Sequence, residues 1–275
     1  MGYAEFIFLK WTVLGEEGQF KERDVMNRPS TIVIPCYNEE LRFPLDRFTA
    51  FVAANPSTHF LLVNDGSTDD TLAVLQRASA GREDQVGVIN QPANGGKGEA
   101  VRCGILAALQ REGCLYVGFW DADMATPLEI IEDLVGVLST RPEVAMVFGA
   151  RVKLLGRHVE RRAIRHYLGR VFATVVSVTL RLPIYDTQCG AKVFRVTQGT
   201  KELFAERFCS RWVFDVEIIA RFIRQRGYDI ASVERSIYEF PLPEWRDVAG
   251  SRVRPRDFVR AFFDVLKIYF RYRAK

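Results

Sequence analysis

The sequence predicts an α/β protein whose central sheet is mostly parallel and flanked by helices. Four short apolar runs, rich in β-branched or aromatic residues, alternate with segments of helical periodicity. A polar loop follows each run, and the carboxyl ends of parallel strands meet at one ligand-binding edge of such a sheet. The length of 275 residues, with 48% hydrophobic and 26% charged residues, is typical of a folded globular chain.

The β-branched run TIVI at residues 31–34 predicts the first strand. It leads into a polar loop at 35–40, and helical periodicity follows over about 44–54. Residues 1–29 show no readable pattern and are assigned to an N-terminal extension.

Residues 60–63, with the sequence FLLV, predict the second strand, and a polar turn follows at 64–70. Within this turn, Ser67 and Asp70 have the spacing of a capping box, which marks the start of a helix. We therefore expect a helix that begins in the turn and runs to about Ala80.

The third strand is expected at 86–90, and the sequence NGGKGE at 94–99 opens the next helix. Glycines allow the backbone to approach a ligand closely, and a helix N-terminus attracts anions, to which Lys97 adds a full positive charge. The glycine spacing matches neither the dinucleotide-binding G-x-G-x-x-G motif nor a P-loop. An NAD-dependent oxidoreductase is therefore disfavoured.

The fourth strand, at 115–120, ends in Asp121 and Asp123, two carboxylates one residue apart. Thr126 as N-cap and Glu129 as its capping-box partner predict that a helix starts directly afterwards. Two carboxylates with this spacing in a turn can offer hard oxygen ligands to Mg²⁺ or Mn²⁺, which in turn binds a diphosphate. A solvated loop is the alternative for so short a motif.

Taken together, the four loops carry more information than any one of them. They place Tyr37, Asn38, Asp65, Lys97 and the acid pair at the same edge of the sheet. Turn chemistry explains each loop singly, but it does not require ligand-type side chains after every strand. The sequence therefore predicts a polar ligand site at this edge.

Two basic amphipathic segments follow in the second half of the chain. Residues 159–182 predict a basic helix that leads into an apolar segment, and residues 251–275 predict a helix with a wide aromatic face. The region 30–250 is then one catalytic domain that carries the first of these helices. Both helices suit a peripheral, membrane-facing position, and core packing with a solvated basic face is the alternative.

Composition and cysteine usage limit the partners and the compartment. A net charge of +4 does not call for a nucleic-acid partner. The five cysteines are odd in number and form no C-x-x-C pair, which favours free thiols in a reducing, cytoplasmic compartment. No window reaches the roughly 18 apolar residues of a membrane-spanning helix, so a peripheral position on the cytosolic face of a membrane is expected.

The loops at the strand ends resemble family 2 of the inverting glycosyltransferases, which have the GT-A nucleotide-diphospho-sugar transferase fold. The matching segments are IPCYNEE at 34–40, DGS at 65–67, NGGKG at 94–98 and DAD at 121–123. Three later segments resemble the dolichyl-phosphate β-glucosyltransferase branch: GAR at 149–151, DTQCGAK at 186–192 and RWVFDVE at 211–217. Ala125 stands where mannosyl relatives more often have Gln, and Asn64 departs from the Asp that the family usually has.

The resemblance implies a donor site for a UDP-sugar. Its residues would be Pro35, Tyr37, Asn38, Glu39, Asp65, Gly66, Ser67, Asn94, Lys97 and Asp121. Asp65 would accept a hydrogen bond from the uracil imide, and Lys97 would face the ribose or the diphosphate. Asp121 and Asp123 would hold Mg²⁺ or Mn²⁺, and Asp123 would thereby be catalytic.

The resemblance also implies a polyprenyl or dolichyl phosphate as the acceptor. Candidate residues for its phosphate are Arg151, Arg157, Arg161, Gln188 and Trp212, because the planar fork of arginine can bind phosphate oxygens in pairs. Residues 212–226 predict a helix in which Asp215 would be the general base or would position the acceptor. A phosphate acceptor lessens the need for a base, since it is already largely ionised at neutral pH.

The function expected from the sequence is the transfer of a hexose to a polyprenyl or dolichyl phosphate with inversion. The expected hexose is glucose, and the expected donor is UDP-glucose. Two alternatives remain at this point: a family 2 enzyme with a hydroxyl acceptor, for which Asp215 is an obligatory base, and a membrane-associated subunit that keeps the fold without turnover.

Overall fold

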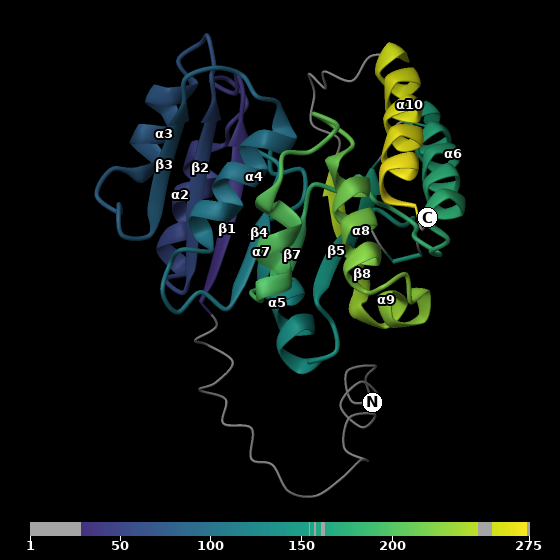
Figure 1. The fold of residues 1–275 in the computed structure, drawn as a ribbon. Coiled ribbons are helices and arrows are strands. Elements are labelled where there is room, and N and C mark those ends of the chain that lie inside the picture. The colour runs from purple at the N-terminus through teal and green to yellow at the C-terminus, as the bar shows by residue number, and fades with distance from the viewer. Residues whose placement is uncertain (1–28, 154, 157, 161–162, 247–254, 274–275) are drawn as a thin grey trace, which may run out of the picture.

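A seven-stranded sheet forms the centre of the molecule (Figure 1). The computed structural model describes residues 29–153, 155–156, 158–160, 163–246 and 255–273. In spatial order the strands are β3 (Val86–Gln91), β2 (Thr58–Asp65), β1 (Ser30–Cys36), β4 (Tyr116–Phe119), β7 (Lys192–Arg195), β5 (Met146–Ala150) and β8 (Ile237–Pro241). All neighbouring pairs are parallel except the two that β7 makes with β4 and β5. The expected mostly parallel sheet is thus confirmed, with the first four strands in the predicted places.

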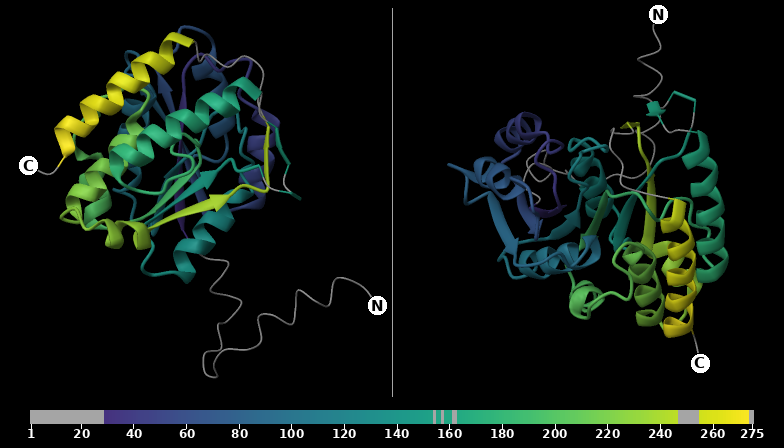
Figure 2. Two further views of the ribbon diagram at one scale, coloured as in Figure 1. Left: turned by 90° about the vertical axis from the view of Figure 1, so that its right-hand side faces the viewer. Right: turned by 90° about the horizontal axis from the view of Figure 1, so that it is seen from above.

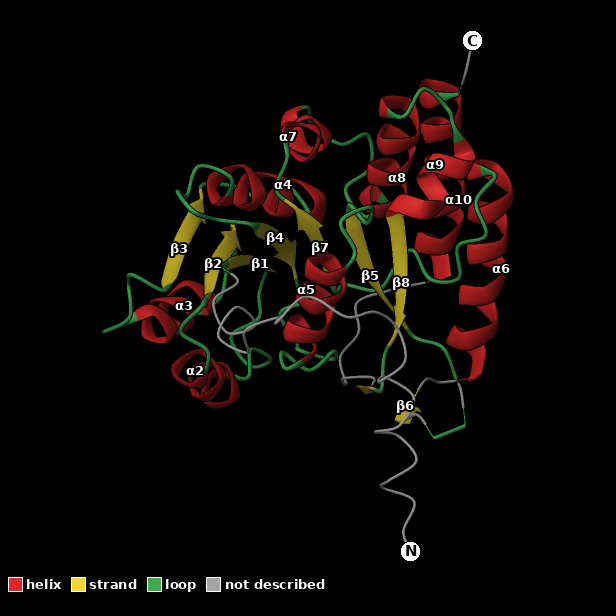
Figure 3. Ribbon diagram, turned by 90° about the horizontal axis from the view of Figure 1, so that it is seen from below, coloured by secondary structure: helices red, strands yellow, loops and turns green. Residues whose placement is uncertain are grey.

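Helices cover both faces of the sheet, as Figure 3 shows. One face packs against α2 (Leu45–Ala54), α3 (Thr71–Ser79) and α5 (Ile130–Thr140). The other face packs against α4 (Lys97–Ala108), α7 (Gln198–Ala205) and α8 (Phe214–Gln225). Alternate strand residues supply the two cores: Ile32 and Ile34 of β1 face the first set of helices, and Val33 faces the second.

Two long helices lie outside α8, at the end of the sheet where β5 and β8 are found. They are α6 (Ala163–Leu180) and α10 (Pro255–Tyr272), which pack against each other and against α8 (Figure 2). The short helix α9 (Ile230–Ser236) leads into β8, and β6 (His158–Glu160) pairs with β9 (Glu244–Arg246) in a separate two-stranded sheet. No helix in the described ranges is both long and apolar enough to cross a lipid bilayer.

Three predicted helix starts were wrong. Neither capping box forms: α3 begins at Thr71 and α5 at Ile130, and no side chain caps either helix. The hydroxyl of Ser67 instead accepts a hydrogen bond from the amide of Asn38 (3.0 Å), and the carbonyl of Thr126 accepts one from the indole of Trp120 (2.9 Å). Residues 159–160, expected in the basic helix, belong to the strand β6.

A buried polar cluster ties α10 to α8. Glu217 is fully buried, and its carboxylate accepts hydrogen bonds from Arg221 (2.8 Å), the Tyr272 hydroxyl (2.8 Å) and the amide of Cys209 (2.6 Å). Arg221 in turn donates to the Tyr272 hydroxyl (3.2 Å). A buried charge needs such partners, so this cluster fixes the position of the C-terminal helix.

Tyr272→Phe removes one donor to the buried Glu217 carboxylate and one acceptor for Arg221. We expect the free energy of unfolding to fall by about 1–3 kcal/mol, the cost of leaving buried polar groups unsatisfied. Urea denaturation followed by circular dichroism measures the change. Tyr269→Phe, on the same helix but exposed, is the matched control. Equal stability of the two variants contradicts the assignment.

Candidate active site

The acid pair lies in a tight turn directly after β4. The amide of Met124 donates to the carbonyl of Asp121 (3.1 Å), and the amide of Ala125 donates to the carboxylate of Asp123 (3.2 Å). Met124 has a positive φ of 48°, a conformation that is uncommon for a residue with a side chain. The turn thereby presents both carboxylates at the carboxyl edge of the sheet, as predicted.

Asp121 is held between two loops that are distant in the sequence. Its Oδ1 lies 2.5 Å from Nζ of Lys97, at the start of α4. On the other side the backbone of Gly190 comes so close that a Cβ there would lie 1.9 Å from Asp121 Oδ2. Burial opposes ionisation of Asp121, but the positive charges of Lys97, Arg151 and Lys192 outweigh it and lower its pKa. Asp121 is therefore ionised at neutral pH.

Asp123 pairs with a cation that the sequence analysis did not identify. Nη2 of Arg42 lies 2.9 Å from Asp123 Oδ2, and Nη1 lies 3.2 Å from Glu39. Burial and the neighbouring charge of Asp121 raise the pKa of Asp123, against the opposing effects of the Ala125 amide and Arg42. Two adjacent carboxylates that repel each other are a natural site for a cation.

Asp65, at the end of β2, organises the glycine-rich loop. Its carboxylate accepts hydrogen bonds from the amides of Gly95 (2.7 Å) and Gly96 (2.9 Å) and from the side chain of Asn94 (3.0 Å). Burial raises its pKa, although these amides act in the opposite direction. In this structure Asp65 therefore shapes the loop that carries Lys97, in addition to any contact with a base.

The loop after β1 and the loop after β2 are joined to each other. Besides the Asn38 to Ser67 bond, the amide of Thr68 donates to the Asn38 side chain (2.8 Å), and the amide of Glu39 donates to the Thr71 hydroxyl (2.7 Å). Asn38 has a positive φ of 50°, which turns the chain at this point.

Several further donor-site predictions fall in these two loops. Tyr37, beside Asn38, is 37% exposed, and Pro35 pairs in register with Val63 of β2. Gly66 has a φ of +62°, and a Cβ there would lie 2.5 Å from the backbone of Asn94. Asn64, where the resemblance led us to expect an acid, bridges the Ser67 amide and the Asn90 side chain.

The predicted acceptor residues are only partly assembled. Arg151 binds Asp186 in a bidentate pair, with nitrogen to oxygen distances of 2.6 and 2.8 Å, so two of its three guanidinium nitrogens are engaged. Nε2 of Gln188, in the same loop as Asp186, is buried and has no hydrogen-bond partner among the described residues. Trp212 lies just before α8, its amide donating to Ser210. Arg157 and Arg161 lie outside the described residues.

Asp215, the predicted base, is buried beside Lys192, the last residue of the DTQCGAK segment, for which no role was predicted. Nζ of Lys192 lies 2.6 Å from Asp215 Oδ1, and Lys192 is fully buried. The same ammonium donates to the carbonyls of Thr187 (2.9 Å) and Cys189 (2.5 Å). Asp215 and Lys192 thus form an ion pair behind the Gly190 loop. The negative charges of Asp121 and Asp215 both raise the pKa of Lys97, against the opposing effect of burial.

A divalent metal is compatible with this donor set. In the described part of the chain no three His, Cys, Asp or Glu side chains are arranged to hold a metal ion. Mg²⁺, however, is commonly bound by one or two carboxylates together with substrate phosphates. Asp121 and Asp123 supply two such carboxylates, and Lys97 lies beside them to receive a further negative charge. The arrangement is suited to binding a diphosphate.

Comparison with known proteins identifies the family of the chain. Residues 31–197 match the model of the family described as glycosyl transferase family 2. A dolichyl-phosphate beta-glucosyltransferase of Trichomonas vaginalis is 31% identical over 257 residues, which cover 89% of this chain and 72% of that protein. The human dolichyl-phosphate beta-glucosyltransferase is 29% identical over 250 residues, with coverages of 84% and 72%.

Solved structures share the fold at low sequence identity. Glucosyl-3-phosphoglycerate synthase from Mycobacterium tuberculosis, in complex with Mn²⁺, UDP and glucosyl-3-phosphoglycerate, superposes with a TM-score of 0.61 at 17% identity. The match covers 94% of this chain and 86% of that chain.

Gly190→Ala tests the close approach of the two loops. A Cβ at this position collides with the Asp121 carboxylate, so we expect the variant to lose about 1–3 kcal/mol of stability, as over-packed sites do. Gly136→Ala, within α5 where a Cβ meets no atom within 4 Å, is the control and should be stabilised by about 0.5–1 kcal/mol. Chemical denaturation of both variants decides the matter, and a Gly190→Ala protein as stable as the wild type refutes the described approach.

Proposed function

This chain belongs to glycosyl transferase family 2 and has its GT-A fold, and on that basis we propose that it transfers glucose from UDP-glucose to a dolichyl or polyprenyl phosphate with inversion. That it is a glycosyltransferase follows from the family and from relatives named for that activity. The observation that carries the finer proposal is the position of Asp121. This carboxylate joins the glycine-rich donor loop, through Lys97, to the loop that contains Gln188 and Gly190.

The donor occupies the edge formed by the first four strands. The loop of Tyr37, Asn38 and Glu39, with Gly66 and Ser67 beside it, frames the base and the ribose. Asp65 and Asn94 hold the glycine-rich loop, so that Lys97 faces the diphosphate. The mycobacterial synthase shares this fold and binds UDP together with Mn²⁺, which supports a uridine donor with a divalent ion for this chain.

Asp121 and Asp123 would hold Mg²⁺ or Mn²⁺. When bound, such an ion neutralises negative charge on the departing diphosphate. Lys97 supplies a further positive charge on the same side. Arg42 keeps Asp123 oriented from the base-binding loop and competes with any other cation for its carboxylate.

The transfer itself is a single displacement. An oxygen of the acceptor phosphate forms a bond to the anomeric carbon as the bond from that carbon to the diphosphate oxygen breaks. The electron pair of the broken bond leaves with UDP, and the configuration at the anomeric carbon is inverted. An ionised phosphate needs no base to remove a proton.

The pairing of Asp215 favours a phosphate acceptor over a hydroxyl acceptor. Asp215 Oδ1 lies 2.6 Å from the buried ammonium of Lys192, so this carboxylate oxygen is already occupied by a cation of the protein itself. Nε2 of Gln188, which has no hydrogen-bond partner in the described part of the chain, is a donor suited to a phosphate oxygen. Arg151 contributes positive charge nearby while Asp186 fixes its orientation.

The surface of α6 and α10 supports a peripheral position on a membrane. Phe262, Phe263 and Phe270 on α10 are 44%, 63% and 62% exposed, and Val171 and Val178 on α6 are 64% and 74% exposed. An exposed apolar surface of this kind is typical of an interaction site. Ile268, on the same helix, is fully buried in the core.

Cations lie on the same helix: Arg260, Lys267 and Arg271 all belong to α10. Aromatic side chains interleaved with cations suit the interface of an anionic lipid surface. The five free cysteines support the cytosolic face, since disulfides are rare in a reducing compartment.

Asp123→Asn should reduce glucosyl transfer by about 100-fold or more, because a metal ligand contributes several kcal/mol to the stabilisation of the leaving group. The assay measures radiolabel transferred from UDP-glucose to polyprenyl phosphate in Mn²⁺-containing buffer. Asp133→Asn, which changes an exposed carboxylate on α5, should leave the rate unchanged. A folded Asp123→Asn protein with full activity contradicts the role of the acid pair.

Gln188→Leu should raise the KM for polyprenyl phosphate by about tenfold, because a hydrogen bond to a charged group contributes roughly 1.5–3 kcal/mol. The KM for UDP-glucose should stay near the wild-type value, since Gln188 is assigned to the acceptor alone. Steady-state kinetics with each substrate varied in turn separates the two constants. An equal rise in both, or no change in either, overturns this assignment.

Phe262→Ser combined with Phe263→Ser should shift the protein from vesicles into solution, since burial of one aromatic side chain contributes about 1.5–3 kcal/mol. Co-sedimentation with vesicles that contain phosphatidylserine measures the bound fraction. Leu115→Ser, at an apolar position 52% exposed and outside α6 and α10, is the control. If the double variant sediments like the wild type, α10 is not the membrane-facing surface.

A further inference from the structure

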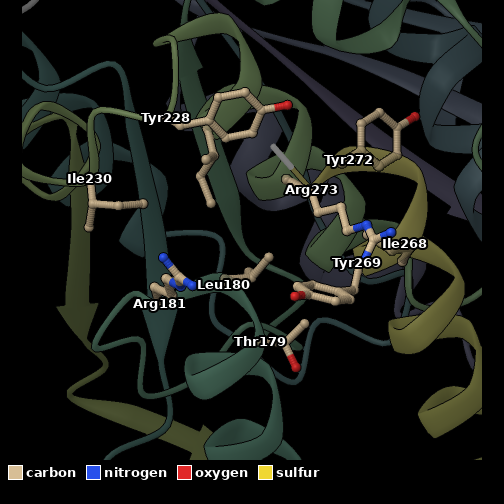
Figure 4. A pocket seen from close by; sticks show the side chains of 11 residues that line it. Thr179, Leu180, Arg181, Tyr228, Ile230, Ile268, Tyr269, Tyr272 and Arg273 are labelled. Atoms are coloured by element: carbon tan, nitrogen blue, oxygen red, sulfur yellow. The ribbon is translucent and has the colours of Figure 1, made fainter. Parts of the chain in front are cut away.

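A cavity of about 260 Å³ lies between the C-terminal ends of α6, α8 and α10, close to the start of α9 (Figure 4). None of the residues assigned to the donor or the acceptor lines it. Helix α8 begins beside the glycine-rich loop, where Phe214 contacts Gly98. The cavity residues Ala220 and Ile223 lie six to nine residues further on, about 9–14 Å along the helix axis. The cavity is therefore separate from the active site.

The walls of the cavity are mostly apolar. Leu180, Ala220, Ile223 and Ile268 line it, and each is at most 6% exposed and part of the hydrophobic core. These side chains come from three helices, so the floor is fixed by core packing. Small-molecule sites typically combine such a preformed apolar wall with a few polar groups.

The charged side chains at this cavity are cationic. Arg181 and Arg273 line it, and none of the residues that the structure describes contributes an acidic side chain. Neither arginine forms an ion pair with any residue that the structure describes. In Figure 4 the two guanidinium groups lie on opposite sides of the apolar floor, and Tyr228 and Tyr269 add hydroxyl groups.

Two of the residues that line the cavity, Arg181 and Tyr228, have a positive φ, which is an uncommon backbone conformation for residues other than glycine. Arg181 follows α6 with a φ of 56°, and Tyr228 follows α8 with a φ of 64°. Such positions at helix ends are usually taken by glycine. The described part of the chain has two other non-glycine residues with positive φ, Asn38 and Met124, and both belong to the candidate active site. Residues in this conformation are enriched at ligand sites.

We propose that this cavity is a second binding site, which takes a small anionic amphiphile. The ligand has a short apolar body, which packs on Leu180 and Ile268, and a phosphate or carboxylate head, which binds one of the two arginines, Arg181 or Arg273, within the positive field of the other. Arginine suits this head group because it stays charged and donates two parallel hydrogen bonds to one anion. Such a ligand is available both as a free molecule and as part of a lipid surface.

Isothermal titration calorimetry of the full chain with monomeric octyl phosphate tests the proposal. We expect saturable binding that Arg181→Gln and Arg273→Gln each weaken: the arginine in contact with the head loses a charge-assisted hydrogen bond, about a tenfold effect, and the other loses a neighbouring positive charge. Inorganic phosphate and octanol, each with half of the required chemistry, should bind far more weakly. Arg226→Gln is the matched control, because Arg226 is exposed, stacks on Phe222 and does not line the cavity.

If octyl phosphate binds only at the acceptor site, the two cavity variants leave its affinity unchanged, and that result overturns the proposal. So does an equal loss of affinity in Arg226→Gln, or no saturable binding to the wild type. Vesicles that contain phosphatidate separate the two sources of the ligand. Loss of vesicle binding in the same two variants assigns the site to a lipid head group, and unchanged vesicle binding assigns it to a free amphiphile.

Discussion

The geometry of the site depends on the contact between the Asp121 carboxylate and the backbone of Gly190. Asp121 follows a central strand and is fixed by its turn, so the loop that contains Gly190 must approach it closely, which only a residue without Cβ permits. The same loop also carries Asp186, Gln188 and, at its end, Lys192. This close contact therefore brings the loop that contains Gly190 onto the sheet edge formed by the first four strands.

Electrostatic balance explains why so many charges can share this edge. Lys97 balances Asp121, Arg42 balances Asp123, Arg151 balances Asp186, and Lys192 balances Asp215, each at 2.5 to 2.9 Å. Unpaired charges at these partly or fully buried positions would be costly. A donor diphosphate with its metal brings both signs of charge, and can exchange partners with Lys97 and Arg42 without a large change in net charge.

Much of the fold could be predicted from the sequence because strand and helix periodicities alternate clearly in the first half of the chain. The errors fell where a rule of local spacing was applied: Ser67 has the spacing of a helix cap, but its hydroxyl accepts a hydrogen bond from the amide of Asn38, 29 residues away. Thr126 has the same spacing, but α5 begins only at Ile130. Arg42 could not be assigned, since it lies 81 residues from Asp123 in the chain. The burial of Lys192 could not be predicted from its place at the end of the DTQCGAK segment, because burial of a lysine is set by tertiary packing. The pairing of Arg151 with Asp186, 35 residues further along the chain, also depends on tertiary packing and was not predicted.

We propose that the edge around Asp121 passes glucose from a uridine donor to a lipid phosphate. The most direct measurement incubates the purified chain and Mn²⁺ with radiolabelled UDP-glucose or GDP-mannose, in the presence of dolichyl phosphate or of dolichol. Organic extraction and NMR of the product then give the acceptor and the anomeric configuration. We expect β-linked glucosyl phosphodolichol from UDP-glucose and dolichyl phosphate alone. Transfer to dolichol, a preference for GDP-mannose, or an α-linked product contradicts it.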